Sequence, residues 1–313
     1  MTKLGFIILA IAIFTRVDDL LAQSKLAYID RVDKAYDLYK LKQYKPSAVT
    51  YSSALKSNPK YGRLEDLYNA ACSWSLAGNV DSSFLYLFKL VNNYQYHYIG
   101  QLSGDKDLQP LHNDKRWQDL ISRAAHNKQK ADAKLNRPLM KSLDTIYDKD
   151  QVLRWKIDSI QKYYGTSSIQ LKKLWDTINY NDSINVIKVE RIIKQHGWPG
   201  IDIVGEKCNK AIWLVIQHAS LEKQLKYVPL LRKSVEQDKS PAKYLALMED
   251  RVLMFQGKKQ IYGSQYEFDE PTQKYKLYPI ADERLVNDRR KLMGLPPLEE
   301  EAKTFGIDYH LPL

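Results

Sequence analysis

Apolar residues recur at helical spacing through most of the C-terminal half of this chain. Side chains three or four positions apart lie on one face of a helix, so each such run predicts a helix that packs by one face. A first helical segment runs from Leu143 to Ile160, and a break at residues 165–168 follows it. The further predicted helices are Ile169–Ile178, Ile184–Lys194, Gly205–His218, Glu222–Val235 and Pro241–Phe255. Asp182 or Ser183 would cap the second of these helices with a side-chain oxygen.

The pattern changes after Gly257. Residues 260–268 and 274–280 alternate between apolar and polar positions, and a turn-forming segment separates them, which predicts a β-hairpin. A last helix is predicted over Asp282–Met293, ending at Gly294. The chain is therefore expected to be mainly α, with one small β-hairpin in its C-terminal part.

Residues 25–126 carry an internal repeat. The order of small and large residues in its first copy returns 36 positions later, for example from Ala35 to Ala71 and from Ser47 to Ser83. The first copy contains Ala35, Leu38, Ser47, Tyr51, Ala54 and Pro59. This order resembles the tetratricopeptide repeat, a pair of helices that approach closely at their small residues. The resemblance implies tetratricopeptide-like helical hairpins and a surface for a protein partner.

A polar and charged stretch, Asn127–Arg137, separates these repeats from the rest of the chain. Because the stretch lacks apolar anchors, we expect it to be the boundary between two domains. The expected division is a signal peptide at residues 1–22, a helical repeat domain at residues 25–126 and a helical domain at residues 138–300.

The first 22 residues have the features of an export signal. Lys3 is followed by the apolar run Leu4–Phe14, and Leu20-Leu21-Ala22 offers a cleavage point before Gln23. The run is too short to span a bilayer in the mature protein, although an uncleaved anchor is an alternative. No Cys follows Ala22, which excludes a bacterial lipoprotein anchor. We therefore expect a periplasmic or secreted protein with no stable membrane span after cleavage.

Composition narrows the classes of ligand and cofactor. The net charge is +11, but Lys and Arg are scattered along the chain and form no dense cluster, so no nucleic acid partner is expected. Cys72 and Cys208 fall in different expected domains, which favours two buried thiols over a disulfide. The chain contains no zinc-binding HExxH pair, phosphate-binding glycine loop or dinucleotide fingerprint. Neither a metal nor a cofactor is therefore expected.

Four short polar motifs between residues 196 and 265 supply the candidate site. They are His196-Gly197-Trp198-Pro199-Gly200, Gln217-His218, Glu249-Asp250-Arg251-Val252 and Gln260-Ile261-Tyr262-Gly263-Ser264-Gln265. His218 or His196 would be the acid–base, with Asp250 orienting it and Arg251 holding an anionic group. The expected substrate-binding residues are Trp198, Gln217, Gln260, Tyr262 and Gln265. The alternative is structural, since buried polar groups also need internal partners.

The order of these motifs resembles a bacterial domain family of unknown function. The pattern also includes Asp150-Gln151 with Arg154, Asp182 with Asn185, and Gly294-Leu295-Pro296-Pro297. It covers about residues 140–300, and members of the family often carry a signal peptide or helical repeats before it. This chain has Ser264 where Thr is usual, and Ser220 where Asp is frequent, which removes a carboxylate next to His218. The resemblance implies one site formed by these polar positions, and it implies no particular activity.

Two functions are compatible with these features. The first is an enzyme of the cell envelope, a hydrolase with an acid–base histidine in a polar pocket. The second is a noncatalytic module that binds a small molecule, a sugar or a peptide, with the repeats recruiting a protein partner. Convergence of His218, Asp250, Arg251 and Gln265 on one open cleft favours the enzyme, whereas burial with internal partners favours a structural role.

Overall fold

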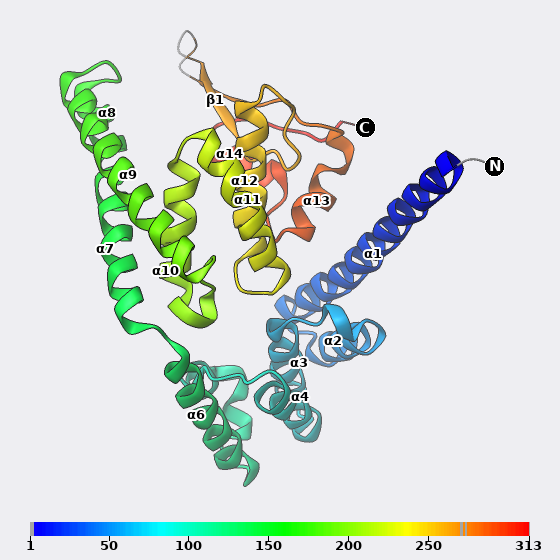
Figure 1. The fold of residues 1–313 in the computed structure, drawn as a ribbon. Coiled ribbons are helices and arrows are strands. Elements are labelled where there is room, and N and C mark those ends of the chain that lie inside the picture. Colours follow the sequence, from blue (N-terminus) through cyan, green and yellow to red (C-terminus); the bar gives the residue numbers. More distant parts are fainter. Residues whose placement is uncertain (1–2, 270–271, 273, 313) are drawn as a thin grey trace. The chain divides into compact units, whose positions relative to one another are not determined.

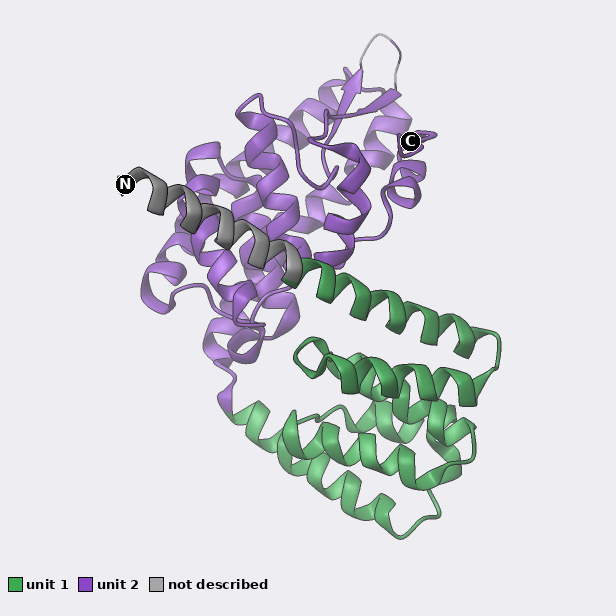
Figure 2. Cartoon of the chain, turned by 90° about the vertical axis from the view of Figure 1, so that its right-hand side faces the viewer, with its two compact units in different colours: residues 1–133 green, residues 134–313 purple. Residues whose placement is uncertain are grey.

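Helices make up most of this protein, whose computed structural model describes residues 3–269, 272 and 274–312 (Figure 1). Side chains are described from residue 21 onward. This part of the chain contains 14 α-helices and one antiparallel pair of short strands. The expected mainly α fold with one small β-hairpin is therefore confirmed. The chain divides into two compact units, residues 1–133 and residues 134–313 (Figure 2).

Unit 1 is built from consecutive antiparallel helices. They are α1 (Lys3–Lys40), α2 (Tyr44–Ser57), α3 (Leu64–Leu76), α4 (Val80–Asn93), α5 (Ile99–Gly104) and α6 (Arg116–Lys134), whose last residue belongs to unit 2, with 3-10 turns η1 (Pro59–Tyr61) and η2 (Lys106–Leu111). The neighbours α1 and α2, α2 and α3, and α3 and α4 pack against each other. Their facing sides form one apolar core that includes Tyr51, Phe84, Leu87 and Leu90, and Leu120 of α6 joins this core.

The two helical hairpins of unit 1 repeat the same contact. Ser47 Oγ donates a hydrogen bond of 2.7 Å to the carbonyl of Ala35, and Ser83 Oγ donates one of 2.7 Å to the carbonyl of Ala71. All four residues are fully buried. The small side chains thus allow a close contact between α1 and α2 and the same contact between α3 and α4. The two contacts lie at positions that correspond in the internal repeat.

The stretch Asn127–Arg137, predicted to be the boundary between the two domains, is largely helical, since α6 continues to Lys134. Buried Leu120 and Ala124 anchor the first half of this helix. Asn127 anchors its polar half, because its side-chain amide donates to the carbonyls of Val91 at 2.7 Å and Tyr96 at 3.1 Å. A polar residue thus supplies the attachment that the hydrophobic pattern does not show.

Unit 2 is a helical domain that ends in the β-hairpin. Its elements are α7 (Arg137–Arg154), α8 (Ile157–Tyr164), α9 (Ile169–His196), α10 (Ile201–His218), α11 (Leu221–Glu236), α12 (Ala242–Phe255), β1 (Tyr266–Asp269), β2 (Lys274–Leu277), η3 (Glu283–Leu285), α13 (Val286–Leu292) and α14 (Leu298–Thr304). Helices α7, α9 and α10 pack on one another, and α11 packs on α12. The second half of α10 is buried, and it carries Ile212, Val215 and Ile216 into the core.

Residues 169–196 form one continuous helix, so the two separate helices predicted here are wrong. Segment 179–183 contains no Gly or Pro that would interrupt the helix. Neither expected cap acts as one. Ser183 Oγ donates to the carbonyl of Tyr180 within the helix, and Asp182 pairs with Arg154 of α7.

The β-hairpin is shorter than its sequence pattern. Strands β1 and β2 pair antiparallel, with Tyr266 opposite Leu277 and Asp269 opposite Lys274. Residues 261–265, predicted to lie in the first strand, form no strand, and Gln260 makes only an isolated bridge to Ile280. Residues 270, 271 and 273, between the two strands in sequence, lie outside the described residues.

The last helical region also differs from its prediction. In place of one helix over residues 282–293, the chain forms the turn η3 and the short helix α13. Helix α14 was not predicted from the pattern. Its buried Leu298 joins Ile280 and Val286 in a small apolar cluster under the hairpin.

The export signal expected at residues 1–22 lies almost wholly outside the residues whose side chains are described. Among the described residues, we find no helix with the length and apolar character needed to cross a membrane. Cys72 in unit 1 and Cys208 in unit 2 are both buried, unbonded thiols.

Candidate functional site

His218, at the end of α10, faces a buried carboxylate. Its Nδ1 lies 3.1 Å from Oδ1 of Asp150, a residue of α7 that is 1% exposed. Because an ionised carboxylate only accepts hydrogen bonds, this contact places the proton of a neutral imidazole on Nδ1. Nε2 then keeps a free lone pair, and it has no hydrogen-bond partner among the described residues.

Asp150 is itself held by a chain of polar contacts. Gln151 Nε2 donates to Asp150 Oδ2 at 2.6 Å, and Arg154 Nη1 lies 3.5 Å from Asp150 Oδ1. The guanidinium of Arg154 also donates to Asp182 of α9 at 2.7 Å. We call these five residues, His218, Asp150, Gln151, Arg154 and Asp182, the His218 cluster. Helices α7, α9 and α10 bring them together from three distant parts of the domain.

The surroundings of Asp150 keep its carboxylate ionised. Burial alone would raise the pKa of Asp150. The hydrogen bond and charge of His218 oppose this effect, as do the charge of Arg154 and the hydrogen bond from Gln151. Together they hold the pKa below its ordinary value. The carboxylate therefore stays negative at neutral pH.

Acid should remove the stability that Asp150 contributes. Because its pKa is depressed in the folded state, this contribution is complete above the unfolded pKa of about 3.9 and is lost as pH falls through the folded value. We expect Asp150→Asn to be less stable than wild type in urea unfolding at pH 7, and the difference to shrink near pH 3. Asp176→Asn, which changes an exposed residue of α9, is the control. A difference that is the same at both pH values would contradict the assignment.

A hollow of about 310 Å³ lies beside His218. Asp182, Ser183, Ser220 and Lys223 line it together with His218. Lys223, which also lines the hollow, pairs with Glu190 at 2.8 Å. The volume is at the lower end of the range for small-molecule sites, and the hollow gives a ligand access to the histidine.

Asp150, Asp182 and His218 could also hold a metal ion, since their ligand atoms lie within 4.8 Å of one another. Two carboxylates and one imidazole are a donor set that divalent metals use. Arg154, however, already pairs with both carboxylates. A metal would have to displace this guanidinium. We therefore infer that Arg154, rather than a metal, balances the negative charges of Asp150 and Asp182.

Arg251 of α12 lies near Arg154 and has no carboxylate partner in the described part of the chain. Burial and then the charge of Arg154 lower its pKa. Its Nε is buried without a hydrogen-bond acceptor among the described residues. Two neighbouring guanidinium groups, one without an anion, form a place where an anionic group would be favoured.

We expect Arg251→Met to change the free energy of unfolding by less than about 1 kcal/mol, because it breaks no ion pair and relieves a repulsion. The matched control is Arg290→Met. Arg290 is fully buried, donates to the carbonyls of Tyr262 and Pro296, and pairs with Glu301. Its loss should cost about 3–5 kcal/mol in urea unfolding. A similar cost at Arg251 would show that this residue has a structural anionic partner.

Asp250 makes its contacts away from the His218 cluster. Its Oδ1 accepts from the backbone N–H groups of Ile261 at 2.7 Å and Tyr262 at 3.0 Å. Its Oδ2 accepts from the backbone N–H of Ser264 at 3.0 Å and from Ser264 Oγ at 2.9 Å. The side chain is fully buried. The carboxylate therefore holds the loop of residues 260–265, and the carboxylate that contacts His218 is Asp150.

Two arginines hold the same loop by its carbonyl groups. Arg289 Nε donates to the carbonyl of Ile261 at 2.8 Å, and Arg290 Nη1 donates to that of Tyr262 at 2.7 Å. Gly263 has a φ of 68°, and a Cβ there would lie 2.9 Å from Ile280 Cδ1. The bound N–H groups and this backbone conformation explain why the segment does not continue as a strand.

The amide side chains expected to bind substrate also form hydrogen bonds to backbone groups of the protein. Gln260 Nε2 donates to the carbonyl of Tyr278 at 2.6 Å, and its Oε1 accepts from the backbone N–H of Gln265 at 2.8 Å. The amides of Gln217 and Gln265 both donate to the carbonyl of Leu247, at 3.3 and 3.4 Å. Gln217, Gln260 and Gln265 therefore all have internal hydrogen-bond partners, and those of Gln260 and Gln265 help to hold the loop in place.

Tyr262 and Gln217 complete this network. Tyr262 hydroxyl donates to Glu249 at 3.3 Å. Gln217 is buried, and its Oε1 has no donor among the described residues. The structure thus brings together Gln217, Asp250, Gln260, Tyr262 and Gln265 in one network of mostly internal bonds.

His196 and Trp198 line a different hollow, of about 500 Å³, which shares no lining residue with the one beside His218. His196 is exposed, whereas Trp198 is 8% exposed and its Nε1 has no acceptor in the described residues. Asn209 positions the turn by donating to the carbonyl of Pro199 at 2.9 Å. Lys233, Lys239 and Asp202 also line this hollow, and Lys239 Nζ lies 3.9 Å from Asp202 Oδ2.

Residues 139–312 match a protein family whose description is Family of unknown function (DUF6624). The chain belongs to this family. The match confirms the expected C-terminal domain of unknown function and reaches beyond residue 300 to include all of α14. No curated protein and no solved structure matches the chain. The His218 cluster, the loop at residues 260–265 and both hollows all lie within the DUF6624 domain.

Several residues that organise this domain were not among the expected site residues. Asp150, Gln151, Arg154 and Asp182 occur in the motif order that carries the family resemblance, and that order was the available signal for them. Arg290 had no such signal. It stands in a basic run of a kind that is typical of an exposed surface. Most of its hydrogen-bond partners are main-chain carbonyls, which a sequence pattern does not reveal.

Proposed function

We propose that the DUF6624 domain of this chain hydrolyses a small ligand bound beside His218. The observation that carries this proposal is the contact between His218 Nδ1 and the buried carboxylate of Asp150, next to a hollow lined by the same histidine. A histidine oriented by a carboxylate is a common acid–base in hydrolases. The contact fixes the ring and leaves Nε2 available for proton transfer.

The proposed reaction uses water as the nucleophile. Nε2 of neutral His218 accepts a proton from a water molecule as its oxygen attacks an ester, amide or phosphoester centre. Asp150, kept ionised by Arg154 and Gln151, stabilises the imidazolium that forms. Nε2 then gives the proton to the leaving group, and the histidine returns to its neutral form.

Arg251 would bind an anionic group of the ligand in this proposal. Its guanidinium lies near Arg154, and no described carboxylate neutralises it. An anionic ligand would remove this imbalance of charge, which makes esters or amides that carry a carboxylate or phosphate the favoured substrate class.

A noncatalytic ligand-binding role has one observation in its favour. Trp198 lines the second hollow, and its indole Nε1 is buried and has no acceptor among the described residues. A ligand that accepts a hydrogen bond there would satisfy it. A sugar or peptide would meet this requirement with a hydroxyl or carbonyl oxygen.

We further propose that the chain is exported to the periplasm or beyond, and that unit 1 is a tetratricopeptide-like scaffold for a protein partner. The sequence of residues 1–22 supports export. The repeated serine–carbonyl contacts of the two hairpins support the scaffold.

A turnover screen of the full-length protein tests the hydrolase proposal. The panel should contain chromogenic carboxylic esters, amides and phosphoesters, each in a neutral form and in a form with an added carboxylate. We expect turnover of at least one anionic member and slower turnover of its neutral analogue. Equal rates on both forms would remove the role of Arg251, and no turnover of any member would leave only the binding role.

A further inference from the structure

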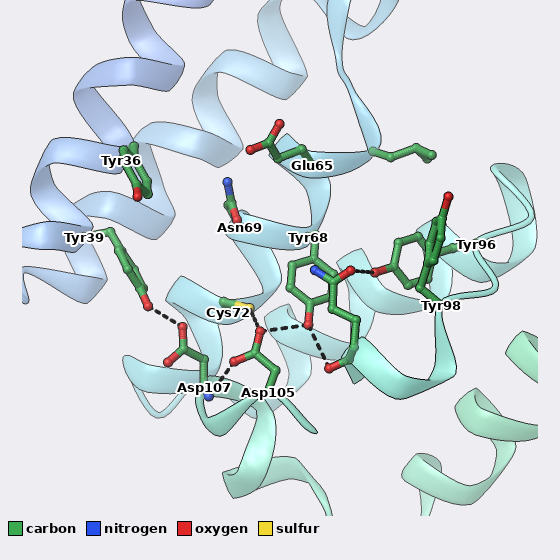
Figure 3. A pocket seen from close by; sticks show the side chains of 12 residues that line it. Tyr36, Tyr39, Glu65, Tyr68, Asn69, Cys72, Tyr96, Tyr98, Asp105 and Asp107 are labelled. Atoms are coloured by element: carbon green, nitrogen blue, oxygen red, sulfur yellow. Dashed lines mark hydrogen bonds between the residues drawn. The ribbon is translucent and has the colours of Figure 1, made fainter. Parts of the chain in front are cut away.

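Unit 1 contains a pocket of about 530 Å³ that lies between α1, α3 and residues 96–107 (Figure 3). Tyr36 and Tyr39 of α1 form one wall, and Tyr98 lies at the opposite side. Asp105 and Asp107 line the pocket between these two sides, in the lower part of the view. Its volume is that of a small-molecule site, and all its lining residues belong to unit 1.

The two aspartates of this pocket have only neutral hydrogen-bond donors. Tyr68 hydroxyl donates to Asp105 Oδ2 at 2.8 Å, and the backbone N–H of Asp107 donates to Asp105 Oδ1 at 2.9 Å. Tyr39 hydroxyl donates to Asp107 Oδ2. No Lys, Arg or His lines the pocket, and neither aspartate forms an ion pair within the described part of unit 1. Two half-buried negative charges thus lack a counter-charge in a chain of net charge +11.

The negative potential in the pocket acts on the groups around it. Burial raises the pKa of Cys72, and the charges of Asp105 and Asp107 raise it further. Burial and then the hydrogen bond to Asp107 likewise raise the pKa of Tyr39. These groups therefore stay neutral, and a ligand with positive charge would relieve the potential.

Aromatic rings line the walls above the aspartates. Tyr36 and Tyr98 are 49% and 50% exposed. Tyr36 stacks on Tyr39 with ring centroids 6.1 Å apart. Lys40, which pairs with Asp37, already places its Nζ 5.1 Å from the centroid of the Tyr36 ring. Ring faces attract cations, and they also cover the alkyl stem that carries an ammonium group.

We propose that this pocket binds an organic cation with a primary ammonium or guanidinium group. The cationic head lies against Asp105 and Asp107, and its alkyl stem lies against Tyr36 and Tyr98. Glu65, an exposed residue that also lines the pocket, adds a third negative charge. The inference is independent of the hydrolase proposal, and it narrows the scaffold role proposed for unit 1 to ligands or partners that present a cation.

Calorimetric titration of the full-length protein tests this inference. The ligands are 1,5-diaminopentane, a blocked peptide with one lysine, the same peptide with acetyl-lysine, and pentanol. We expect the two cations to bind and the two neutral compounds not to bind. Tighter binding of the diamine would identify a free amine as the source of the cation, and tighter binding of the peptide would identify a lysine of a partner protein.

Two variants in the pocket and one control variant locate the binding. Asp107→Asn removes one charge but keeps an oxygen that can accept from Tyr39, and we expect it to weaken cation binding about tenfold or more. Asp119→Asn removes an exposed carboxylate of α6 and should leave the affinity unchanged. Tyr98→Leu should also weaken binding, and circular dichroism shows whether each variant is folded.

Three results would overturn the inference. One is the absence of cation binding at millimolar concentration, and another is the same affinity in wild type and Asp107→Asn. The third is tight binding of Mn²⁺ or Zn²⁺ that excludes the amines, since Cys72, Asp105 and Asp107 also lie close enough to share a metal.

Discussion

Replacement of Asp250 by Ala is expected to lower the free energy of unfolding by about 3–5 kcal/mol. The substitution removes the acceptor for three backbone N–H groups, those of Ile261, Tyr262 and Ser264, and for the Ser264 hydroxyl. A buried donor that loses its partner costs about 1–3 kcal/mol. Arg289 and Arg290 would still hold the loop by its carbonyl groups, so the loss should fall short of the full sum.

Urea unfolding followed by circular dichroism measures this loss. Asp250→Asn should cost less than Asp250→Ala, because one acceptor oxygen remains. Asp176→Ala, at an exposed position of α9, should change stability by less than about 0.5 kcal/mol. A cost below about 1 kcal/mol for Asp250→Ala would show that Asp250 does not support the loop.

The long helices of the C-terminal domain could be predicted because their apolar faces repeat over many residues. Helix α12 begins and ends within one residue of its prediction. The break predicted inside α9 arose because Asp182 and Ser183 are also the residue types that cap helices. What decides their role is Arg154, 28 positions earlier in the chain, which takes Asp182 as its partner.

The loop at residues 260–265 could not be predicted for a related reason. Its alternating apolar and polar residues are typical of a strand. The backbone N–H groups that a strand needs are bound by Asp250, and the carbonyls are bound by Arg289 and Arg290. Such contacts depend on the packing of α12 and α13 around the loop, and a periodic pattern does not contain this information.

The sequence predicted one polar cluster, and the structure divides its residues between two sets of contacts. Gln217, Asp250 and Gln265 do belong to one network. His218, one residue after Gln217, instead contacts Asp150, which is 68 positions away in sequence. Asp250 is closer to His218 in the sequence, but the packing of α7 on α10 brings Asp150 into contact with it.

His218→Ala is expected to lower kcat of the hydrolysis that we propose by about 10²–10⁴-fold, the usual contribution of a positioned acid–base. Asp150→Asn should cause a loss of the same order. An asparagine can turn its NH₂ group toward Nδ1, which would favour the tautomer with the proton on Nε2 and block proton acceptance there. The two losses should not add in the double variant, because both remove the same proton transfer.

The most direct measurement is kcat of the full-length protein and these variants on the best substrate of the turnover panel, with His196→Ala as the matched control. His196 is an exposed histidine that lines the other hollow of the same domain. The account predicts a large loss in His218→Ala and in Asp150→Asn, and a rate near that of wild type in His196→Ala. Full activity in folded His218→Ala, or an equal loss in His196→Ala, would contradict it.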